Sequence, residues 1–165
     1  RNNQHRTRSH FINLHRFDRR DLQHWTDKQV YLHPGEMSIL TGMDVSAIQA
    51  DRIEIARKFA VQWGHVVVLK GAMTVIADPG GRAYVIPVAT AALARAGTGD
   101  VLAGLIVGLR AQGVPAVDAA RAAAWIHAQA GLAAVDLVGH PASVLAGDVL
   151  AAVPEILRDF EHSSG

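Results

Sequence analysis

A short glycine-rich segment carries the residue pattern in this chain that is best suited to chemistry. Gly97-Thr98-Gly99-Asp100 stands directly before an apolar stretch that predicts a helix over residues 101–112. Glycines permit close backbone approach, so the amides of residues 97–100 can point outward at a helix N-terminus, where negative charge is favoured. This predicts a hole for phosphate oxygens, with Asp100 at its lip as the base for an attacking hydroxyl. Alternatively, Asp100 only caps the helix.

Two further segments follow predicted strands, at the sheet edge where open α/β folds bind ligands. Lys70-Gly71-Ala72-Met73-Thr74 leaves room for a base or a ribose, with Lys70 and Thr74 as polar contacts. The alternative is a surface turn with a solvated lysine. His33-Pro34-Gly35-Glu36 is either a second binding segment or a turn around a satisfied histidine. His127, which stands among alanines, is interpreted as a hydrogen-bonded core histidine rather than a ligand.

The sequence offers little for a metal centre. It contains no cysteine, which excludes a disulfide scaffold, a thiolate zinc site and a cysteine nucleophile. His5, His10 and His15 recur every five residues, and five residues turn a helix by about 500°, so these histidines do not share one face. No carboxylate with ligand spacing accompanies them, and we therefore assign no metal ligand.

Length and charge indicate one domain behind a basic leader. The chain has 165 residues, half of them hydrophobic, which is enough for a core. Residues 1–29 carry seven Lys and Arg against three Asp, a net +4, whereas residues 30–165 carry nine basic and twelve acidic residues, a net −3. We expect the leader to be poorly ordered and no nucleic acid to be bound. Because no apolar run reaches the ~18–20 residues of a membrane span, no membrane association and a cytoplasmic location are expected.

Hydrophobic patterning predicts a layered α/β domain over residues 30–165. Strands are expected at 30–32 and at 66–69, and the unbroken apolar run of the second is typical of a strand buried on both faces. Extended runs at 73–77 and 82–87 flank Asp78-Pro79-Gly80-Gly81, a strong hairpin turn.

Four helices complete the pattern. Ser46 and Gln49 form a capping-box signature that predicts a helix through about Trp63, ended by Gly64. Its expected apolar face comprises Ile48, Ile53 or Ile55, Ala56, Phe59 and Ala60. The others are expected at 101–112, at 117–135 and at 147–160, the last of them kinked or divided at Pro154.

Taken in order, these motifs resemble the ADP/ATP-dependent NAD(P)H-hydrate dehydratase family. The resemblance rests on LHPGEM (32–37), VVVLKGAMTVIADPGG (66–81) and LARAGTGDVLAGLIVGLRAQG (93–113), and AAWIHAQAGLAA (123–134) and ASVLAGDVLAAVP (142–154) are similar to the closing helices. It spans roughly residues 30–160 and implies a ribokinase-like α/β fold. Members of the family repair hydrated NADH and NADPH, using a nucleotide's terminal phosphate to activate the hydroxyl, which then leaves as phosphate.

The resemblance also implies roles for residues. Asp100 is the base for the hydroxyl on the hydrated nicotinamide ring, and His33 contacts the hydrated dinucleotide. Gly97, Thr98 and Gly99 form the anion hole, Gly99 also touches the nucleotide, and Lys70, Gly71, Ala72, Met73 and Thr74 bind it. The implied partners are NAD(P)H hydrate and ADP or ATP as co-substrate, with Mg²⁺ shielding the phosphates. AMP, phosphate and NAD(P)H are the expected products from ADP, and a homo-oligomer, tetrameric in the family, is expected.

The resemblance covers only the C-terminal half of the family's domain. We therefore expect the N-terminal part of the sheet to be missing, which exposes a strand edge and apolar faces. Residues 1–29 match nothing in the family. Two alternatives stay open: a ribokinase-like small-molecule kinase of the hydroxymethylpyrimidine or hydroxyethylthiazole type, and an inactive fragment that acts at most as a binding piece.

Overall fold

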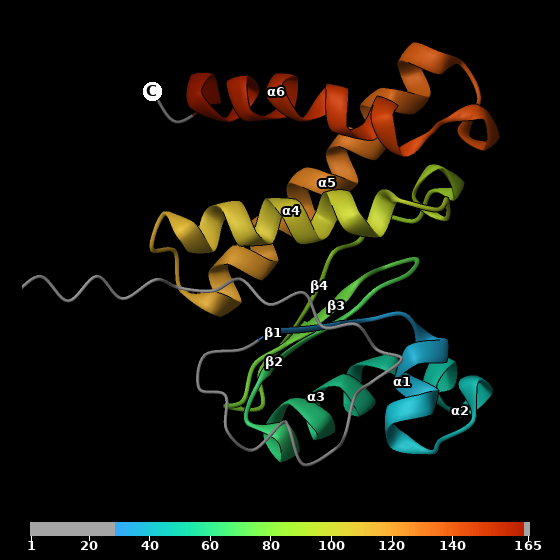
Figure 1. Ribbon diagram of the computed structural model, residues 1–165, viewed down its shortest axis with the longest axis vertical. Helices are drawn as coiled ribbons and strands as arrows, with labels where there is room; N and C mark the ends of the chain where they lie inside the picture. The colour runs from blue at the N-terminus through green and yellow to red at the C-terminus, as the bar shows by residue number, and fades with distance from the viewer. Residues whose placement is uncertain (1–28, 164–165) are drawn as a thin grey trace, which may run out of the picture.

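A computed structural model describes residues 29–163 and shows a sheet with helices on both faces (Figure 1). The elements in chain order are β1 (Gln29–Leu32), α1 (Pro34–Thr41), α2 (Val45–Ala50), α3 (Arg52–Trp63), β2 (Val66–Leu69), β3 (Val75–Ala77), β4 (Ala83–Val85), η3 (Ala91–Leu93), α4 (Thr98–Ala111), α5 (Ala116–Val138), η4 (Pro141–Ser143) and α6 (Ala146–Ser163). The predicted α/β layering is confirmed. Residues 1–28, nearly all of the predicted leader and with them His5, His10 and His15, lie outside the described residues.

The four-stranded sheet has the order β1-β2-β3-β4. β1 and β2 are parallel, and Val30 pairs with Val67, whereas β3 and β4 are added antiparallel. In the described part of the chain β1 is paired on one side only, so the expected open edge lies there rather than at β2. Arg82 and Asp78 close the hairpin between β3 and β4 as predicted, although both strands are shorter than the expected runs.

β2 is buried on both faces, as its unbroken apolar run predicted. Val67 and Leu69 pack with α1, α2 and α3, whereas Val66 and Val68 pack with α4 and α5. Because successive side chains of a strand point to opposite faces, these four consecutive residues contribute to two separate cores. A third core joins α5 to α6 and η3, so that α5 contributes to two of the three cores. Figure 1 shows the resulting stack, with α1–α3 below the sheet and α4, α5 and α6 above it.

The first helices begin differently from the prediction. His33-Pro34-Gly35-Glu36 opens α1 instead of forming a turn, because proline suits the first helical position and His33 caps the helix. The predicted capping box at Ser46 and Gln49 is wrong: Asp44 is the N-cap residue of α2. Asp51, with φ −141° and ψ 56°, then separates α2 from α3. Of the two alternatives for the apolar face, Ile55 is buried and Ile53 is 44% exposed.

The C-terminal helices are longer than predicted. α4 starts at Thr98, three residues before the expected position, and α5 extends to Val138. α6 continues through Pro154. Val149, Ala152 and Val153 before this proline are buried in the third core, and the partly buried Ile156 after it packs against the same core. This packing offsets the missing backbone hydrogen bond. Within residues 29–163 no helix combines the length and the apolar character that crossing a bilayer requires.

The hairpin turn holds a buried carboxylate that links stability to pH. Asp78 is 4% exposed, and its Oδ1 and Oδ2 accept hydrogen bonds from Arg82 N at 3.1 Å and Arg82 Nε at 2.8 Å. Burial alone would raise the pKa of Asp78, but the hydrogen bonds and charge of Arg82, with the Gly80 backbone, together lower that pKa. Ionised Asp78 therefore stabilises the fold above the unfolded-state pKa of about 3.9, and this stabilisation is lost as the pH falls through the lower, folded-state pKa.

We expect Asp78→Asn to reduce the free energy of unfolding by about 1–2 kcal/mol at neutral pH, because the charged hydrogen-bond acceptor is lost. The difference from the unchanged chain should diminish as the pH falls through the lowered folded-state pKa of Asp78, where the carboxylate itself becomes protonated. Urea denaturation followed by circular dichroism across this range measures both effects. Asp118→Asn is the control, because Asp118 forms an exposed pair with Arg121. A deficit of Asp78→Asn that stays constant with pH would contradict the assignment.

Candidate functional site

A cavity of about 350 Å³ opens at the carboxyl ends of β1 and β2. It lies beside the N-terminus of α4 and is also walled by η3 and α5. Its lining residues are His33, Pro34, Lys70, Gly71, Ala72, Thr74, Val88, Thr90, Leu93, Ala94, Arg95, Thr98, Gly99, Leu102 and His127. The structure thus brings together seven of the ten residues singled out from the sequence and leaves Met73, Gly97 and Asp100 outside the lining.

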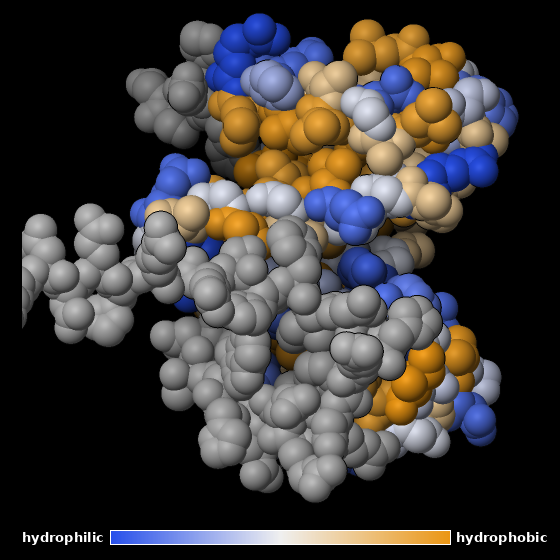
Figure 2. Space-filling model, viewed as in Figure 1, coloured by the Kyte–Doolittle hydropathy of each residue, from blue (hydrophilic) through white to orange (hydrophobic). Residues whose placement is uncertain are grey.

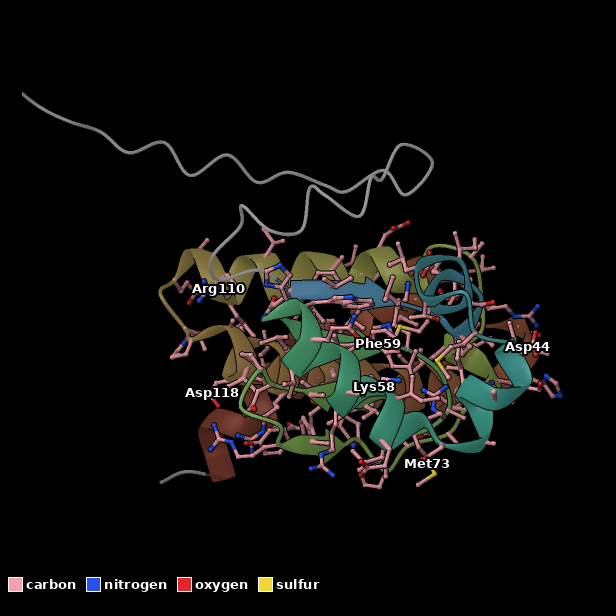
Figure 3. The ribbon with its side chains drawn as sticks, turned by 90° about the horizontal axis from the view of Figure 1, so that it is seen from below. Asp44, Lys58, Phe59, Met73, Arg110 and Asp118 are labelled. Atoms are coloured by element: carbon pink, nitrogen blue, oxygen red, sulfur yellow. The ribbon has the colours of Figure 1, made fainter. Side chains whose placement is uncertain are left out.

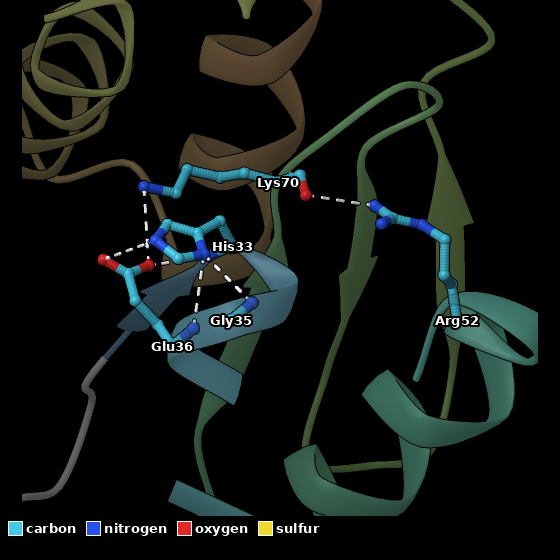
Figure 4. A network of polar contacts seen from close by, with 5 residues as sticks. All are labelled: His33, Gly35, Glu36, Arg52 and Lys70. Atoms are coloured by element: carbon cyan, nitrogen blue, oxygen red, sulfur yellow. Dashed lines mark hydrogen bonds and ion pairs between the residues drawn. The ribbon is translucent and has the colours of Figure 1, made fainter. Parts of the chain in front are cut away.

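The segment after β2 is fixed to its surroundings by backbone contacts. Lys70 N donates to Leu32 O at 2.7 Å, which continues the parallel pairing beyond the strands, and Met73 N donates to Val88 O at 2.9 Å. From the other side, Arg52 Nη2 donates to Leu69 O at 2.8 Å and to Lys70 O at 3.2 Å (Figure 4). Residues 71–73 are therefore an exposed turn whose backbone is held in one conformation by its neighbours.

Arg52 is a residue that sequence reasoning missed. Its guanidinium lies beneath the turn, where a Cβ at Gly71 would come within 3.1 Å of Nη1 and Nη2. Gly71 has a φ of +145°, which glycine alone adopts without strain. Burial lowers the pKa of Arg52, and its Nε lacks a partner in residues 29–163. The sequence signal was weak, since an arginine at a helix start is ordinarily solvated.

The side chain of Met73 lies outside the cavity lining. It has a φ of +56°, the left-handed conformation that costs an L residue roughly 1–2 kcal/mol. Its side chain is 51% exposed and points away from the body of the molecule (Figure 3). The conformation turns the chain so that Thr74 faces the cavity and Met73 does not. Any contact of Met73 with a ligand therefore comes from its backbone or from the outer rim.

The N-terminus of α4 forms a smaller anion hole than predicted. Thr98 N donates to Arg95 O and Asp100 N donates to Gly97 O, so two of the four amides are already used. The Thr98 hydroxyl is also used within the protein, because its Oγ1 donates to Leu93 O and Arg95 O, each at 2.8 Å. In the described part of the chain no carbonyl accepts from the amides of Gly97 and Gly99. These two N–H groups remain for a ligand.

Lys70 reaches the anion hole. A Cβ at Gly99 would lie 3.2 Å from Lys70 Nζ, so the absence of a side chain at position 99 lets the ammonium group lie against the start of α4. This places a cation next to the positive end of a helix of 14 residues. Glu36 is the acidic residue that faces this cation, with Oε2 3.8 Å from Nζ. The combined field favours an anion in the cavity.

His33 is held in one tautomer. Its Nδ1 accepts from Gly35 N at 3.0 Å and from Glu36 N at 3.2 Å, so the neutral ring carries its proton on Nε2. Glu36 returns the contact, because Oε2 accepts from His33 N at 2.7 Å and Oε1 lies 3.6 Å from Nε2. Figure 4 shows the Glu36 carboxylate in contact with both His33 and Lys70. The sequence placed Glu36 in the candidate segment 33–36 but assigned it no role of its own, although its position three residues after a helix cap and its neighbour Pro34 were available signals.

Asp100 faces away from the cavity. It lies in the first turn of α4, is exposed, and lines a groove of about 560 Å³ between α4, α5 and α6. The other groove residues are Val101, Gly104, Leu105, Gly108, Leu109, Gln112, Ile126, Leu150 and Leu157, so the groove is apolar (Figure 2). The expected place at the lip of the cavity is therefore wrong, because the helical rotation directs residue 100 to the opposite side. The carboxylate accepts no hydrogen bond from the described residues, so it makes no capping hydrogen bond either.

The described residues contain no group of three or more His, Asp or Glu side chains gathered as metal ligands. The charged and titratable side chains that line the cavity are His33, Lys70, Arg95 and His127. This set suits phosphate oxygens and does not suit a bare cation. A divalent ion fits this site as the companion of a polyphosphate, which supplies the oxygen ligands itself.

Comparison with known proteins agrees with the motifs. A profile of the family described as NAD(P)H-hydrate dehydratase matches residues 29–155. A bifunctional NAD(P)H-hydrate repair enzyme Nnr from Moorella thermoacetica is 46% identical over 130 residues, which are 79% of this chain and 24% of that protein. An ADP-dependent (S)-NAD(P)H-hydrate dehydratase from Neisseria meningitidis is 44% identical over 117 residues, 71% of this chain and 40% of that protein. The chain thus spans well under half the length of these relatives.

Solved structures give the same result. The ADP/ATP-dependent NAD(P)H-hydrate dehydratase from Bacillus subtilis, co-crystallised with ATP and Mg²⁺, has a TM-score of 0.75 and 34% identity, covering 80% of this chain and 47% of that one. A ribokinase-like superfamily protein from Enterococcus faecalis, 24% identical with a TM-score of 0.68 over 80% of this chain and 44% of that one, shares the fold. The fold is therefore ribokinase-like, in the part that this chain covers. The chain belongs to the NAD(P)H-hydrate dehydratase family.

Proposed function

We propose that the cavity binds ADP or ATP and that the chain carries the donor half of an NAD(P)H-hydrate dehydratase site. The observation that supports this most directly is the position of Lys70 Nζ against Gly99 at the start of α4, inside the cavity that Gly71, Ala72 and Thr74 also line. A lysine, two available amides and a helix N-terminus together recognise a phosphate group. The small residues of the segment after β2 leave room for the adenosine.

In the proposed reaction Asp100 takes the proton from the hydroxyl of hydrated NADH or NADPH. The hydroxyl oxygen forms a bond to the terminal phosphorus of the nucleotide while the bond from that phosphorus to AMP, or to ADP when ATP is the donor, breaks. The phosphorylated hydroxyl then leaves as phosphate and NAD(P)H is restored. The phosphate reaches the N-terminus of α4 from the cavity and the hydroxyl reaches it from the groove that Asp100 lines, so the two reacting groups meet directly at the end of the helix. His33, at the cavity rim, contacts the hydrated dinucleotide.

Mg²⁺ belongs to this proposal as a companion of the nucleotide. When bound, it neutralises phosphate charge that would otherwise repel the attacking oxygen. The part of the chain that the structure describes offers Lys70 and the amides of Gly97 and Gly99 to the same phosphates. Their contribution is to orient the transferring group, while Glu36 holds Lys70 and His33 in place.

Self-association is a further part of the proposal. Leu145, Leu150 and Leu157 of the α6 region are 67%, 58% and 45% exposed, respectively, and Leu150 and Leu157 also line the apolar groove. Exposed apolar surface of this kind is covered in oligomers more often than in monomers. Sedimentation velocity of the purified chain measures its state of association.

Lys70→Ala should weaken ADP binding about tenfold or more, because a charged hydrogen bond to phosphate contributes about 1.5–3 kcal/mol. Isothermal titration calorimetry with ADP and Mg²⁺ measures this change. Lys58→Ala is the matched control: Lys58 lies on α3, on the opposite face of the sheet from α4, with its ammonium 5.5 Å from the Phe59 ring (Figure 3). Equal affinities of Lys70→Ala and the unchanged chain would show that the nucleotide phosphates do not bind at this cavity.

Asp100→Asn should reduce turnover about 100-fold or more while the affinity for ADP stays unchanged, because only the base is removed. The assay follows phosphate release and the return of absorbance at about 340 nm from hydrated NADH. Asp136→Asn controls for the loss of one negative charge, because Asp136 is an exposed residue of α5 that lines neither the cavity nor the groove.

The two assays separate the alternatives. Phosphorylated substrate without restored NADH would identify a small-molecule kinase. Binding of ADP with no turnover by the unchanged chain would identify a nucleotide-binding piece of a larger enzyme. Turnover that Asp100→Asn leaves intact would refute the assignment of the base.

A further inference from the structure

His127 is a buried histidine in the middle of α5 that the proposed reaction does not use. The residue is 7% exposed and its Nε2 is fully buried, without a hydrogen-bond partner in the described residues. The ring does form a hydrogen bond to the backbone of Thr98, at the start of α4. His127 also lines the cavity that holds Lys70 and Gly99. His127 is therefore a buried, hydrogen-bonded histidine, as the sequence predicted, but the described residues leave its Nε2 without a partner.

An unpartnered polar atom in a core is costly, because it loses its hydrogen bonds to water and gains none from protein. The positions around His127 on α5 show what packing alone selects here, since Ala123, Ala124 and Ala128 belong to one core and Ile126 and Ala130 to another. An apolar residue at position 127 would satisfy the same packing without the cost. The unpartnered Nε2 therefore calls for a hydrogen-bond partner, and a ligand in the cavity that His127 lines can supply it.

The surroundings of the ring identify the chemical class of that ligand. The charged and titratable side chains that line the cavity with it are His33, Lys70 and Arg95, and none of the lining residues is acidic. Glu36, which faces Lys70 and His33, is the nearest counter-charge to this group. The amide of Gly99 and the positive end of α4 add to the field. An oxyanion such as a phosphate group suits these surroundings, and a cation does not.

Burial is the main effect that lowers the pKa of His127, and the positive charge of Lys70 lowers it further. The ring is therefore neutral in the free protein at neutral pH. A bound phosphate supplies the opposite charge and offsets both effects. The ring can then hold two protons, one for the hydrogen bond to the Thr98 backbone and one on Nε2 for the ligand.

We infer that His127 is a further phosphate ligand of this site, and that Nε2 donates a hydrogen bond to a phosphate oxygen of the donor nucleotide. This inference rests on the proposed function. It adds a third element to the phosphate site, so that α5 joins the N-terminus of α4 and the end of β2. It also gives a reason for a histidine on the buried face of α5, which is otherwise mostly alanine.

The test compares ligands with and without phosphate. His127→Phe keeps a planar ring but removes the donor, and we expect it to weaken ADP binding about tenfold to 100-fold while the affinity for adenosine stays unchanged. His127→Gln restores a donor and should recover most of the loss. His140→Phe is the matched control, since His140 is exposed, caps η4 and does not line the cavity. Calorimetry gives the affinities, and thermal unfolding without ligand confirms that each variant is folded.

A second measurement uses the unchanged chain, so it does not depend on whether a His127 variant folds. In the unchanged chain, addition of inorganic pyrophosphate should move the ¹⁵N signal of His127 Nε2 toward that of a protonated nitrogen. An ADP affinity of His127→Phe equal to that of the unchanged chain, an equal loss for ADP and adenosine, or an Nε2 signal that pyrophosphate leaves in place would each overturn the inference. If the unchanged chain binds neither ADP nor adenosine, the proposed function fails and this inference fails with it.

Discussion

The phosphate site depends on the gathering of positive charge at the start of α4. Lys70 Nζ lies against Gly99, beside the positive end of the helix, and Glu36 at 3.8 Å compensates only part of this charge. The ammonium group of Lys70 and the positive end of α4 repel each other in the free protein. In the proposed function, a bound phosphate offsets this electrostatic cost. Gly99 is the residue that makes this approach feasible, because any side chain there would displace the ammonium group.

The backbone contacts around residues 70–74 explain why the lysine can be held in such a place. Leu32 O, Arg52 Nη2 and Val88 O fix the segment from β1, α3 and the end of β4, respectively. Each contact comes from a different part of the fold, so the position of Lys70 follows from the whole sheet and its lower helices. The glycine at position 71 and the left-handed Met73 are local consequences, since the chain must turn sharply above the Arg52 guanidinium.

Much of the fold followed from local pattern, and the errors have identifiable causes. The run Val66–Leu69 predicted a doubly buried strand because four consecutive apolar residues suit no other position, and the structure confirms it. The turn predicted at His33 failed because proline favours a helix start as readily as a turn. The direction of Asp100 could not be predicted, since α4 begins three residues earlier than its apolar pattern indicated. Arg52 escaped notice, and the cavity beside His127 was not predicted, because both depend on contacts with residues far away in the sequence.

The two halves of the proposed site differ in how completely this chain supplies them. The phosphate contacts, the segment after β2 and His127 all surround one cavity, so the nucleotide half is assembled within residues 29–163. For the hydrated dinucleotide the described residues offer His33 at the cavity and Asp100 in an apolar groove on the other side of the α4 N-terminus. The relatives are more than twice as long as this chain's matching part. Under the proposed function, nucleotide binding is therefore the property expected of these residues alone, and turnover makes the greater demand on the remainder of a dehydratase domain.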